Sequence, residues 1–217
     1  MLFRSALIKI WDGLYNDQET AEIWRVLDAV QERCLWDTDE RVGSATLKTE
    51  NKRQGRGVWL GSSGRQELPD DLHGINEILM KLYDGPTSEY ASEGMFERGI
   101  LLTNSHQNLL SYYENGDHYK AHWDSSPYTA LTWFCREPQA FSGGDLFLPE
   151  INETVPFKNH RTVLFPGHVW HEVTPVRMPE ELSGQNLGRF CISQFLRIDS
   201  HLHQEAKNDA RKRDAGS

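Results

Sequence analysis

Apolar residues in the first hundred positions recur at helical spacing in two places. The first stripe has spacings of four and three: Ile23, Leu27 and Val30. It predicts a helix that begins at Asn16 or Asp17, either of which suits an N-cap, and ends near Arg33. The second stripe has similar spacings: Leu72, Ile75, Leu79 and Leu82. It predicts a helix over Pro69–Tyr83, which the Asp84-Gly85-Pro86 turn ends.

Extended segments flank these helices. Leu2–Trp11 alternates loosely between apolar and polar residues and predicts an edge strand. Gly43–Leu60 predicts one or two strands around a turn at Arg53–Gly57. Gly61–Gly64 predicts a flexible loop, because it contains only glycine and serine.

From Glu97 onward, short apolar or alternating runs recur between turn residues. These runs are Ile100–Thr103, Leu109–Tyr113, Ala130–Phe134, Asp145–Leu148, Thr154–Phe157, Thr162–Phe165, Val169–Val173 and Arg189–Ile198. Many short strands between Gly, Pro and Asn turns predict two packed sheets or a closed barrel. The expected fold is therefore mainly β with flanking helices (α+β): a double-stranded β-helix, or jelly roll, with the N-terminal helices packed on one outer face.

The length of 217 residues suits one large β-rich domain. We expect this domain to cover residues 1–200, in which residues 1–96 support a jelly-roll core at residues 97–200. Residues 201–217 form a polar tail. Seven Trp, nine Phe and seven Tyr supply enough apolar surface for a sizeable core.

Composition narrows the function classes. The net charge of −9 disfavours a nucleic-acid or anionic-membrane partner. No stretch has the length of a membrane span, and Met1–Trp11 lacks the features of a signal peptide. The three cysteines, Cys34, Cys135 and Cys191, form no CxxC pair and predict free thiols in a reducing compartment. We therefore expect a cytoplasmic protein that binds neither nucleic acid nor membrane, in an oligomeric state that the sequence leaves open.

Candidate chemistry lies in His122-Trp123-Asp124, where an imidazole and a carboxylate stand two positions apart. On a strand, alternate side chains share a face, so both groups reach one point. A second imidazole is supplied by His171. Two imidazoles and one carboxylate form the facial triad that holds non-haem Fe(II) and leaves coordination positions open. The pattern predicts an enzyme with His122, Asp124 and His171 as metal ligands and catalytic residues.

Other histidines offer competing interpretations. His118 and His122 have the spacing of two zinc ligands on a helix, but no Glu follows the first of them. His168 competes with His171, although it follows a Pro-Gly turn whereas His171 begins an apolar run. The remaining histidines are interpreted as surface or capping residues: His73, His106, His160, His201 and His203.

Iron-dependent oxygenation also needs a cation for an acidic co-substrate and a dry pocket. Arg189 is the candidate cation, because a guanidinium binds a carboxylate through two parallel hydrogen bonds. Its alternative role is an arginine at the barrel end, paired with a carboxylate of the protein. Six aromatic residues are candidates for the lining or, alternatively, for the ordinary core: Tyr112, Tyr119, Trp133, Phe134, Trp170 and Phe195.

Taken together, Leu109 to Leu196 resembles the Fe(II)/2-oxoglutarate-dependent dioxygenases, specifically the prolyl-4-hydroxylase-like branch. Four segments carry the resemblance in order: Tyr112–Asp124 with its HxD pattern, Phe141–Leu146 with its F-x-G-G-x-L pattern, Leu164–Val176 around the distal histidine, and Gly188–Ser193 with the basic residue. Arg189 follows His171 at a longer spacing than the family usually has. We interpret Arg177–Leu187 as an inserted surface loop, with Arg177 as the alternative basic residue.

The resemblance implies an enzyme that uses Fe(II), 2-oxoglutarate and O2, with ascorbate as an additional candidate. The implied metal ligands are His122, Asp124 and His171. The implied 2-oxoglutarate residues are Arg189, Tyr112, Tyr119 and Ser193.

The implied reaction hydroxylates an unactivated C–H bond and releases succinate and CO2. A prolyl residue of a protein or peptide is the leading substrate, and a free amino acid or small metabolite is the alternative. Asp124 favours hydroxylation, because related halogenases have a small residue in its place. Arg53–Gly64 resembles by position a mobile segment that covers the active site, although an ordinary exposed loop fits it equally well. Two other classes stay open: a zinc-dependent cupin-like enzyme and a non-catalytic jelly-roll binding module.

Overall fold

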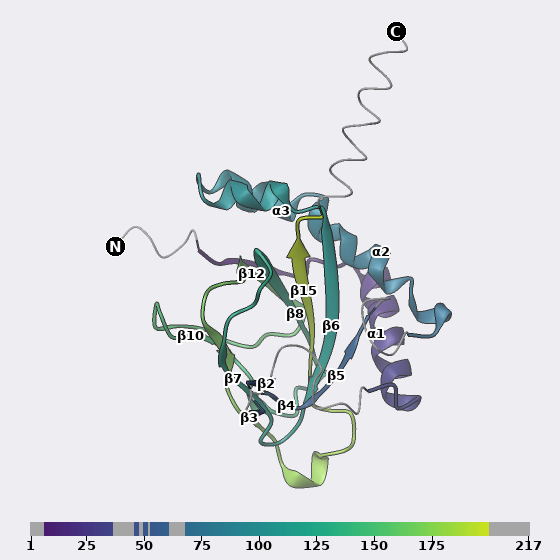
Figure 1. Ribbon diagram of the computed structural model, residues 1–217. Coiled ribbons are helices and arrows are strands. Elements are labelled where there is room, and N and C mark those ends of the chain that lie inside the picture. The colour runs from purple at the N-terminus through teal and green to yellow at the C-terminus, as the bar shows by residue number, and fades with distance from the viewer. Residues whose placement is uncertain (1–6, 37–45, 48–49, 52, 61–67, 200–217) are drawn as a thin grey trace.

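A computed structural model describes residues 7–36, 46–47, 50–51, 53–60 and 68–199 as two facing antiparallel sheets with helices on one side (Figure 1). The larger sheet has the order β1-β12-β8-β15-β6-β5. Its strands are β1 (Lys9–Asp12), β5 (Arg56–Trp59), β6 (Ser105–Tyr113), β8 (Tyr128–Phe134), β12 (Arg161–Pro166) and β15 (Arg189–Arg197).

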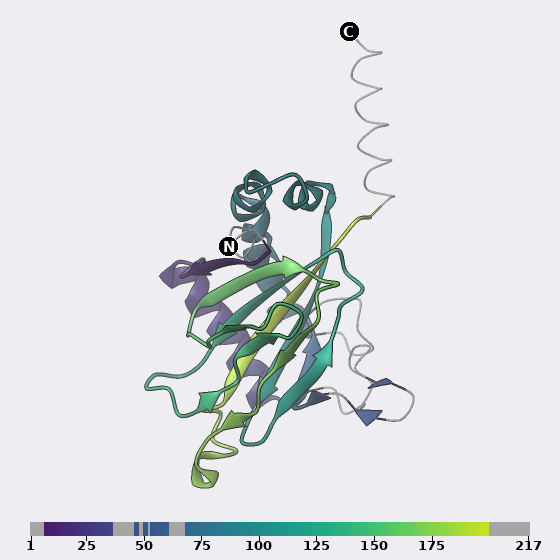
Figure 2. The ribbon, with the colours of Figure 1, turned by 90° about the vertical axis from the view of Figure 1, so that its left-hand side faces the viewer.

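The smaller sheet has the order β11-β10-β13-β7-β4. Its strands are β4 (Arg53–Gln54), β7 (His118–His122), β10 (Leu146–Leu148), β11 (Glu153–Val155) and β13 (His171–Val173). Two short ribbons accompany the sheets: β2 (Thr46–Leu47) with β3 (Glu50–Asn51), and β9 (Ser142–Gly143) with β14 (Val176–Arg177). The predicted jelly roll is confirmed. Figure 2 places the smaller sheet in front and α1 (Asp17–Glu32) behind both sheets.

The alternating side chains of β15 divide the core into two layers. Cys191 belongs to the cluster between the sheets, together with Trp133 and Phe165. Phe190 and Ile192 point the other way, into the cluster that α1 and α2 (Ile75–Leu79) cover. The prediction that the N-terminal helices pack on one outer face is therefore confirmed.

The first predicted helix is confirmed as α1. Asn16 is the N-cap: its side chain accepts from the Glu19 backbone N–H at 2.9 Å, and the Glu19 carboxylate accepts from the Asn16 backbone N–H at 2.7 Å. This reciprocal pair is a capping box. The predicted stripe of Ile23, Leu27 and Val30 is fully buried.

Asn16→Ala is expected to lower the free energy of unfolding by about 1 kcal/mol, because it removes one half of the capping box. Thermal and denaturant unfolding would measure the loss. Gln18→Ala, at an exposed position of the same first turn, is the matched control and should change little. Equal effects of the two substitutions would contradict the capping role.

The second helical stretch is correct in place but is not one helix. It consists of η1 (Asp70–Leu72), α2 and η2 (Met80–Tyr83), and a turn at residues 73–74 separates the first two. The four predicted apolar residues are all fully buried. Pro86, which was predicted only to end this stretch, begins a further helix, α3 (Pro86–Ser92), because proline suits the first turn.

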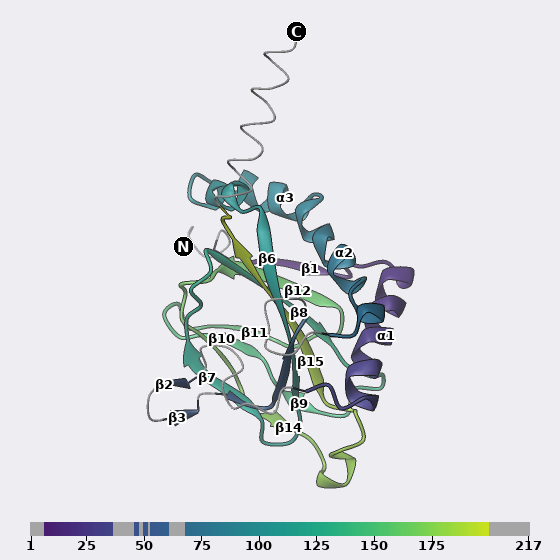
Figure 3. The same cartoon turned by 45° about the vertical axis from the view of Figure 1, so that its right-hand side comes forward.

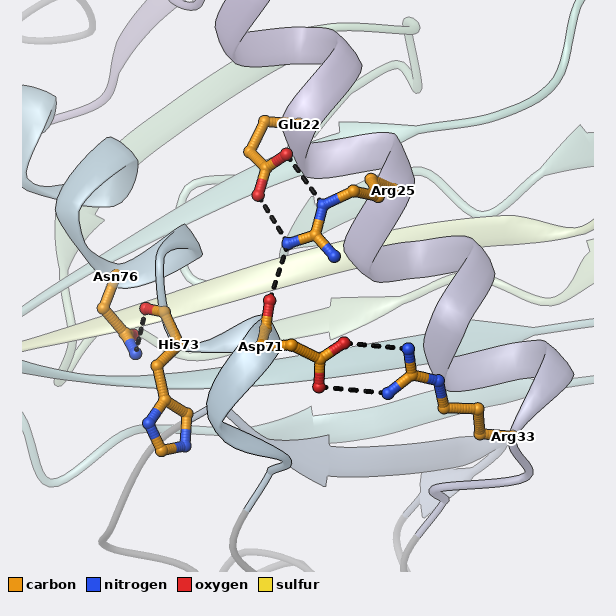
Figure 4. A network of polar contacts seen from close by, with 6 residues as sticks. All are labelled: Glu22, Arg25, Arg33, Asp71, His73 and Asn76. Atoms are coloured by element: carbon orange, nitrogen blue, oxygen red, sulfur yellow. Dashed lines mark hydrogen bonds and ion pairs between the residues drawn. The ribbon is translucent and has the colours of Figure 1, made fainter.

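Polar contacts tie α1 to η1 on the outer surface (Figure 4). The Arg33 guanidinium donates to both carboxylate oxygens of Asp71, at 3.1 and 2.8 Å. Arg25 donates to the Asp71 backbone carbonyl at 2.8 Å and pairs with Glu22. These groups are largely exposed, so they orient the helices rather than stabilise them strongly.

One predicted strand is wrong. Of the run Ile100–Thr103, the first three residues lie in the 3₁₀ helix η3 (Glu97–Leu102), and Thr103 is its C-cap. Its apolar residues do not alternate: Ile100 is buried, whereas Leu101 and Leu102 are more than half exposed. The other seven predicted runs fall on β6, β8, β10, β11, β12, β13 and β15 and are confirmed. Of the predicted edge strand Leu2–Trp11, residues 9–11 lie in β1 at the edge of the larger sheet, whereas the described residues 7 and 8 are not strand.

The segment proposed as a lid is paired where it is described. β4 joins the smaller sheet beside β7, and β5 joins the larger sheet beside β6. Gly55 bridges them at φ 135°, where an added Cβ would lie 2.9 Å from the Tyr112 backbone oxygen. Residues 53–60 are therefore held in the sheets. The predicted loop at 61–64 and the polar tail at 201–217 lie outside the described residues.

The insertion before β15 is a surface loop, as expected. It contains the short helix η4 (Glu180–Leu182), and most of its residues are exposed. Asn115 accepts from the Met178 backbone N–H at 3.2 Å, and Glu114 accepts from the Gly184 backbone N–H at 2.8 Å. The loop projects at the bottom of Figure 3, beyond β9 and β14. It leaves the smaller sheet undisturbed where the candidate metal ligands lie.

Candidate functional site

The smaller sheet brings the three predicted metal ligands together. His122 ends β7, His171 begins β13, and the two residues are directly opposite each other across the strands. Asp124 follows two residues after His122. Its carboxylate lies 3.5 Å from His171 Nε2 and 3.9 Å from His122 Nε2. One ligand atom from each residue lies within 4.8 Å of the others, a donor set of two nitrogens and one oxygen that fits Fe(II).

Backbone carbonyls orient both imidazoles. His122 Nδ1 lies 2.9 Å from the Lys120 carbonyl oxygen, and His171 Nδ1 lies 2.8 Å from the Val169 carbonyl oxygen. A carbonyl only accepts, so each Nδ1 carries the hydrogen and each Nε2 keeps a lone pair. The lone pairs face the Asp124 carboxylate, which is the arrangement that a shared metal ion requires.

Asp124 is held as firmly as the histidines. Thr129 Oγ1 donates to Asp124 Oδ2 at 2.6 Å, and the Asp124 backbone N–H donates to the Gly167 carbonyl at 2.7 Å. Burial raises the pKa of the Asp124 carboxyl, and the His171 imidazole and the Thr129 hydrogen bond offset part of that rise. A cation bound between these ligands would favour the ionised carboxylate.

Thr129→Val is expected to weaken metal binding by roughly 10-fold to 100-fold, because it frees the carboxylate oxygen that Thr129 orients. Titration of the metal-free protein with Fe(II) under anaerobic conditions would measure the change. Thr132→Val is the matched control on the same strand, since Thr132 bonds Thr162 on the opposite face. An equal loss in both variants would assign the effect to packing.

Arg189 lies at the start of β15 and is completely buried. Its three guanidinium nitrogens have no hydrogen-bond partner within the described part of the chain. A buried cation without a counter-charge is costly, so the site fits an anionic ligand. The alternative role of an arginine paired with a carboxylate of the protein does not agree with these contacts. The other alternative, Arg177, is exposed.

Glycine makes room for this guanidinium. Gly144, in the predicted F-x-G-G-x-L segment, has φ +69°, and an added Cβ would lie 2.7 Å from Arg189 Cδ. Aromatic rings surround the cation: its Cζ lies 5.3 Å from the Tyr113 ring centroid, 5.2 Å from Trp133 and 5.7 Å from Phe157. These rings exclude water from the anion site.

Tyr112 is not at this site, which corrects its expected role in binding 2-oxoglutarate. Its ring lies on the outer face of the larger sheet, stacked on Trp36 and packed against Phe190. Its hydroxyl donates to Glu114 at 2.9 Å. Strand alternation instead turns Tyr113 inward, directly opposite Arg189. The sequence could not show which of the two adjacent tyrosines faces the site. That choice depends on the register of β6, which decides which face of the strand lies between the sheets.

The other expected residues divide between the two faces. Tyr119 stacks on His122 with ring centroids 3.7 Å apart. Ser193 lies on the face of β15 that carries Arg189, and its hydroxyl is 3.8 Å from Cys191 Sγ. Phe134, expected in the lining, belongs to the outer cluster. Phe195 packs against Trp59.

The remaining histidines and thiols mostly agree with their expected places. His168 is exposed, in contrast to the buried His171. His106 is a correction: it is not a surface residue but is half-buried and stacked on Tyr83, and burial lowers its pKa. All three cysteines are free. None of the described helices has the length and apolar character needed to cross a membrane.

Comparison with known proteins agrees with this geometry. The family model of the 2OG-Fe(II) oxygenase superfamily matches residues 108–197, which contain the three candidate ligands and Arg189. Over these residues the chain is similar to the 2OG-Fe(II) oxygenases. PKHD-type hydroxylases of Bordetella pertussis and Bordetella bronchiseptica are each 27% identical to this chain over 209 residues, which cover 89% of this chain and 81% of theirs.

Solved structures support the fold of this chain. A prolyl hydroxylase from Trichoplax adhaerens, in complex with a peptide fragment of the hypoxia inducible factor, has a TM-score of 0.61 at 15% identity, with 89% of this chain and 84% of that chain covered. A Pseudomonas putida prolyl-4-hydroxylase has a TM-score of 0.56 at 14% identity, with 88% and 92% covered. The family match and the buried His-Asp-His cluster agree with an enzyme that uses Fe(II) and 2-oxoglutarate.

Proposed function

We propose that this protein hydroxylates an unactivated C–H bond, and that the bond belongs to a prolyl residue of a protein or peptide. The reaction consumes one O2: one oxygen atom enters the new hydroxyl group, and the other enters succinate as 2-oxoglutarate loses CO2. The observation that carries the proposal is the pairing of a buried His-Asp-His cluster with a buried, unpartnered Arg189.

The three ligands would hold the metal from one side. His122 and His171 present Nε2, and Asp124 presents its carboxylate. These ligand atoms all lie within 4.8 Å of one another. Fe(II), when bound, couples the oxidative decarboxylation of 2-oxoglutarate to oxidation of the substrate. The protein contributes orientation, because carbonyl and hydroxyl partners hold each ligand before the metal arrives.

Arg189 would hold the distal carboxylate of 2-oxoglutarate. The inner face of β15 carries it between the sheets, in the same core that the metal ligands face. A bound carboxylate would supply the hydrogen-bond acceptors that the described residues do not offer to the Arg189 guanidinium. The surrounding rings keep water out, which strengthens that ion pair.

A protein or peptide substrate is supported by two observations. The related structures are named as prolyl hydroxylases, and one of them is a complex with a peptide. Large apolar side chains are exposed beside the metal ligands: Trp123 is 53% exposed between His122 and Asp124, and Trp170 is 39% exposed before His171. Exposed aromatic rings offer contact surface to an extended chain. A free amino acid or small metabolite is the alternative substrate.

Succinate formation tests the reaction class. The protein would be loaded with Fe(II) without oxygen and then exposed to air with 2-oxoglutarate, alone and with prolyl peptides. Peptide-dependent succinate, matched by a peptide mass gain of one oxygen atom, is the expected result. Succinate formation without product in any peptide, but with oxidation of free proline or another small metabolite, would support the alternative. No 2-oxoglutarate consumption under any condition would overturn the proposal.

A further inference from the structure

A cavity of about 570 Å³ lies where α3 and η3 meet the ends of two strands of the larger sheet, β8 and β12. A cavity of this size is in the range of sites that bind a small molecule or a single side chain. Its walls are mostly aromatic or apolar: Leu7, Tyr90, Phe96, Pro127, Tyr128 and Pro166. Tyr90 and Tyr128 belong to the cluster on the outer face of the larger sheet, so the cavity is distinct from the space between the sheets where Arg189 is buried.

Hydrogen bonds hold the walls of this cavity in place. The Tyr128 hydroxyl donates to the Phe96 backbone carbonyl at 3.2 Å, and the Tyr90 hydroxyl donates to the Leu7 backbone carbonyl at 3.4 Å. The two tyrosine rings meet edge to face, with their centroids 5.9 Å apart. The Phe96 side chain is 82% exposed, so its ring is accessible at the rim. The cavity is therefore formed before a ligand arrives.

Two short backbone segments connect the cavity to the metal ligands. The Asp124 backbone N–H donates to the Gly167 carbonyl at 2.7 Å, and the Gly167 N–H donates to the Pro127 carbonyl at 3.0 Å. Pro127 lines the cavity and follows three residues after Asp124. Three residues of extended chain span at most about 10 Å. A peptide with one residue at the metal ligands can therefore place a side chain a few positions away in this cavity.

Glu97 gives the otherwise apolar cavity a negative charge. It is a half-buried residue of the lining. Within the described part of the chain, no basic side chain lies within ion-pair distance of Glu97, whereas Glu89 and Glu93 both pair with Lys9, at 2.8 and 2.6 Å. Burial raises the pKa of the Tyr128 hydroxyl, and the charge of Glu97 raises it further. The carboxylate thus acts on a ring of the cavity wall, and a bound cation would neutralise it.

A basic side chain matches this combination better than an apolar or an acidic one does. The aliphatic stem of arginine or lysine buries apolar surface, and its charged end is attracted by a carboxylate and by the faces of aromatic rings. An apolar side chain would remove the Glu97 carboxylate from water without giving it a partner, and an acidic one would be repelled. The net charge of −9 adds long-range attraction for a basic peptide.

We propose that this cavity binds a basic side chain, arginine or lysine, of the peptide substrate, a few positions from the residue that is oxidised. The stem of that side chain lies between Tyr90, Phe96 and Tyr128, and its charged end pairs with Glu97. Glu97 is then a specificity-determining residue. The part of the inference that concerns a peptide rests on the proposed function, whereas the preference of the cavity for a cation does not.

Titration with capped amino acids tests the preference for a cation without any turnover. Zn(II)-loaded, ¹⁵N-labelled protein would be titrated with the N-acetyl N-methylamides of arginine, norleucine and glutamate, and followed by nuclear magnetic resonance. The backbone signals of Glu97 and Gly99, which line the cavity, should move most with the arginine compound. Glu97→Gln should raise the dissociation constant of the arginine compound roughly 5-fold. Glu77→Gln, which removes an exposed carboxylate of α2, is the matched control and should leave it unchanged.

Three results of this titration would overturn the inference. Equal or tighter binding of the norleucine compound would assign the cavity to an apolar side chain. Equal losses in Glu97→Gln and Glu77→Gln would assign the effect to net charge. Signals of Glu97 and Gly99 that change with protein concentration but with none of the three compounds would assign this face to a second copy of the chain.

Peptide turnover tests the position of the basic residue. Capped prolyl peptides would carry arginine or glutamate at each position within four residues of the proline, and kcat/KM would be measured for each pair. At one position, arginine should be preferred over glutamate roughly 10-fold, and Glu97→Lys should reverse the preference at that position. A preference that stays the same in Glu97→Lys would overturn the inference. Oxidation of none of the peptides would overturn the proposed function, and the arginine titration would still decide the preference of the cavity.

Discussion

His171→Ala is expected to reduce 2-oxoglutarate turnover by on the order of 1,000-fold or more, because a metal ion contributes several kcal/mol to stabilisation of the transition state. The variant removes one of three ligands and leaves a cavity where an imidazole packs against Phe165. Stoichiometric Fe(II) titration would measure the loss of metal binding, and succinate formation would measure the loss of turnover. Asp124→Ala should behave similarly.

His168→Ala is the control for that experiment. His168 lies three residues earlier, in the turn before β13, is exposed, and is the histidine that competes with His171 in the sequence. It should keep both metal binding and turnover. A variant at His168 that loses Fe(II) while His171→Ala retains it would reverse the ligand assignment.

Arg189→Met is expected to weaken 2-oxoglutarate binding by roughly 100-fold or more, because truncating one partner of a buried charge pair leaves the other unpaired. The same variant should be at least as stable as wild type in the absence of 2-oxoglutarate. The wild-type guanidinium is buried without an acceptor in the described protein, a situation that costs about 1–3 kcal/mol or more. Methionine fills similar volume without a charge to desolvate.

Thermal unfolding with and without 2-oxoglutarate checks both parts of this prediction. Saturating 2-oxoglutarate should raise the melting temperature of the metal-loaded wild type and leave that of the variant nearly unchanged. Arg56→Met is the control, because Arg56 is an exposed arginine of the same sheet. Strong destabilisation of ligand-free Arg189→Met would show that the guanidinium has a partner within the protein.

Several features were available from local pattern alone. The capped stripe of α1 and the short strands after Glu97 follow from side-chain periodicity and turn residues, which act over a few positions. The HxD pair and the F-x-G-G-x-L segment combine residue types with a fixed local conformation, so their chemistry was visible before the fold. Length and periodicity likewise predicted the covering helices.

Local pattern failed where neighbours in space decide the conformation. The apolar run at Ile100 became a 3₁₀ helix, because one buried residue is anchored among side chains from other elements. Tyr112 and Tyr113 could not be told apart, since only pairing with β15 shows which tyrosine faces inward. The sequence also could not show that the buried side-chain nitrogens of Arg189 and Trp133 lack a hydrogen-bond partner among the described residues, because that depends on which side chains surround them in the fold.

The sequence by itself determined the elements of the jelly roll and the identity of the three candidate ligands, because secondary-structure periodicity and metal chemistry depend on residue type and short spacing. Only the tertiary structure decided which faces of the strands enclose the site. Register shifts of one residue exchange the two faces of a strand, and register depends on contacts between segments far apart in the chain. The long-range pairing of β15 with β6 and β8 therefore placed Arg189, Tyr113 and Trp133 around one buried point.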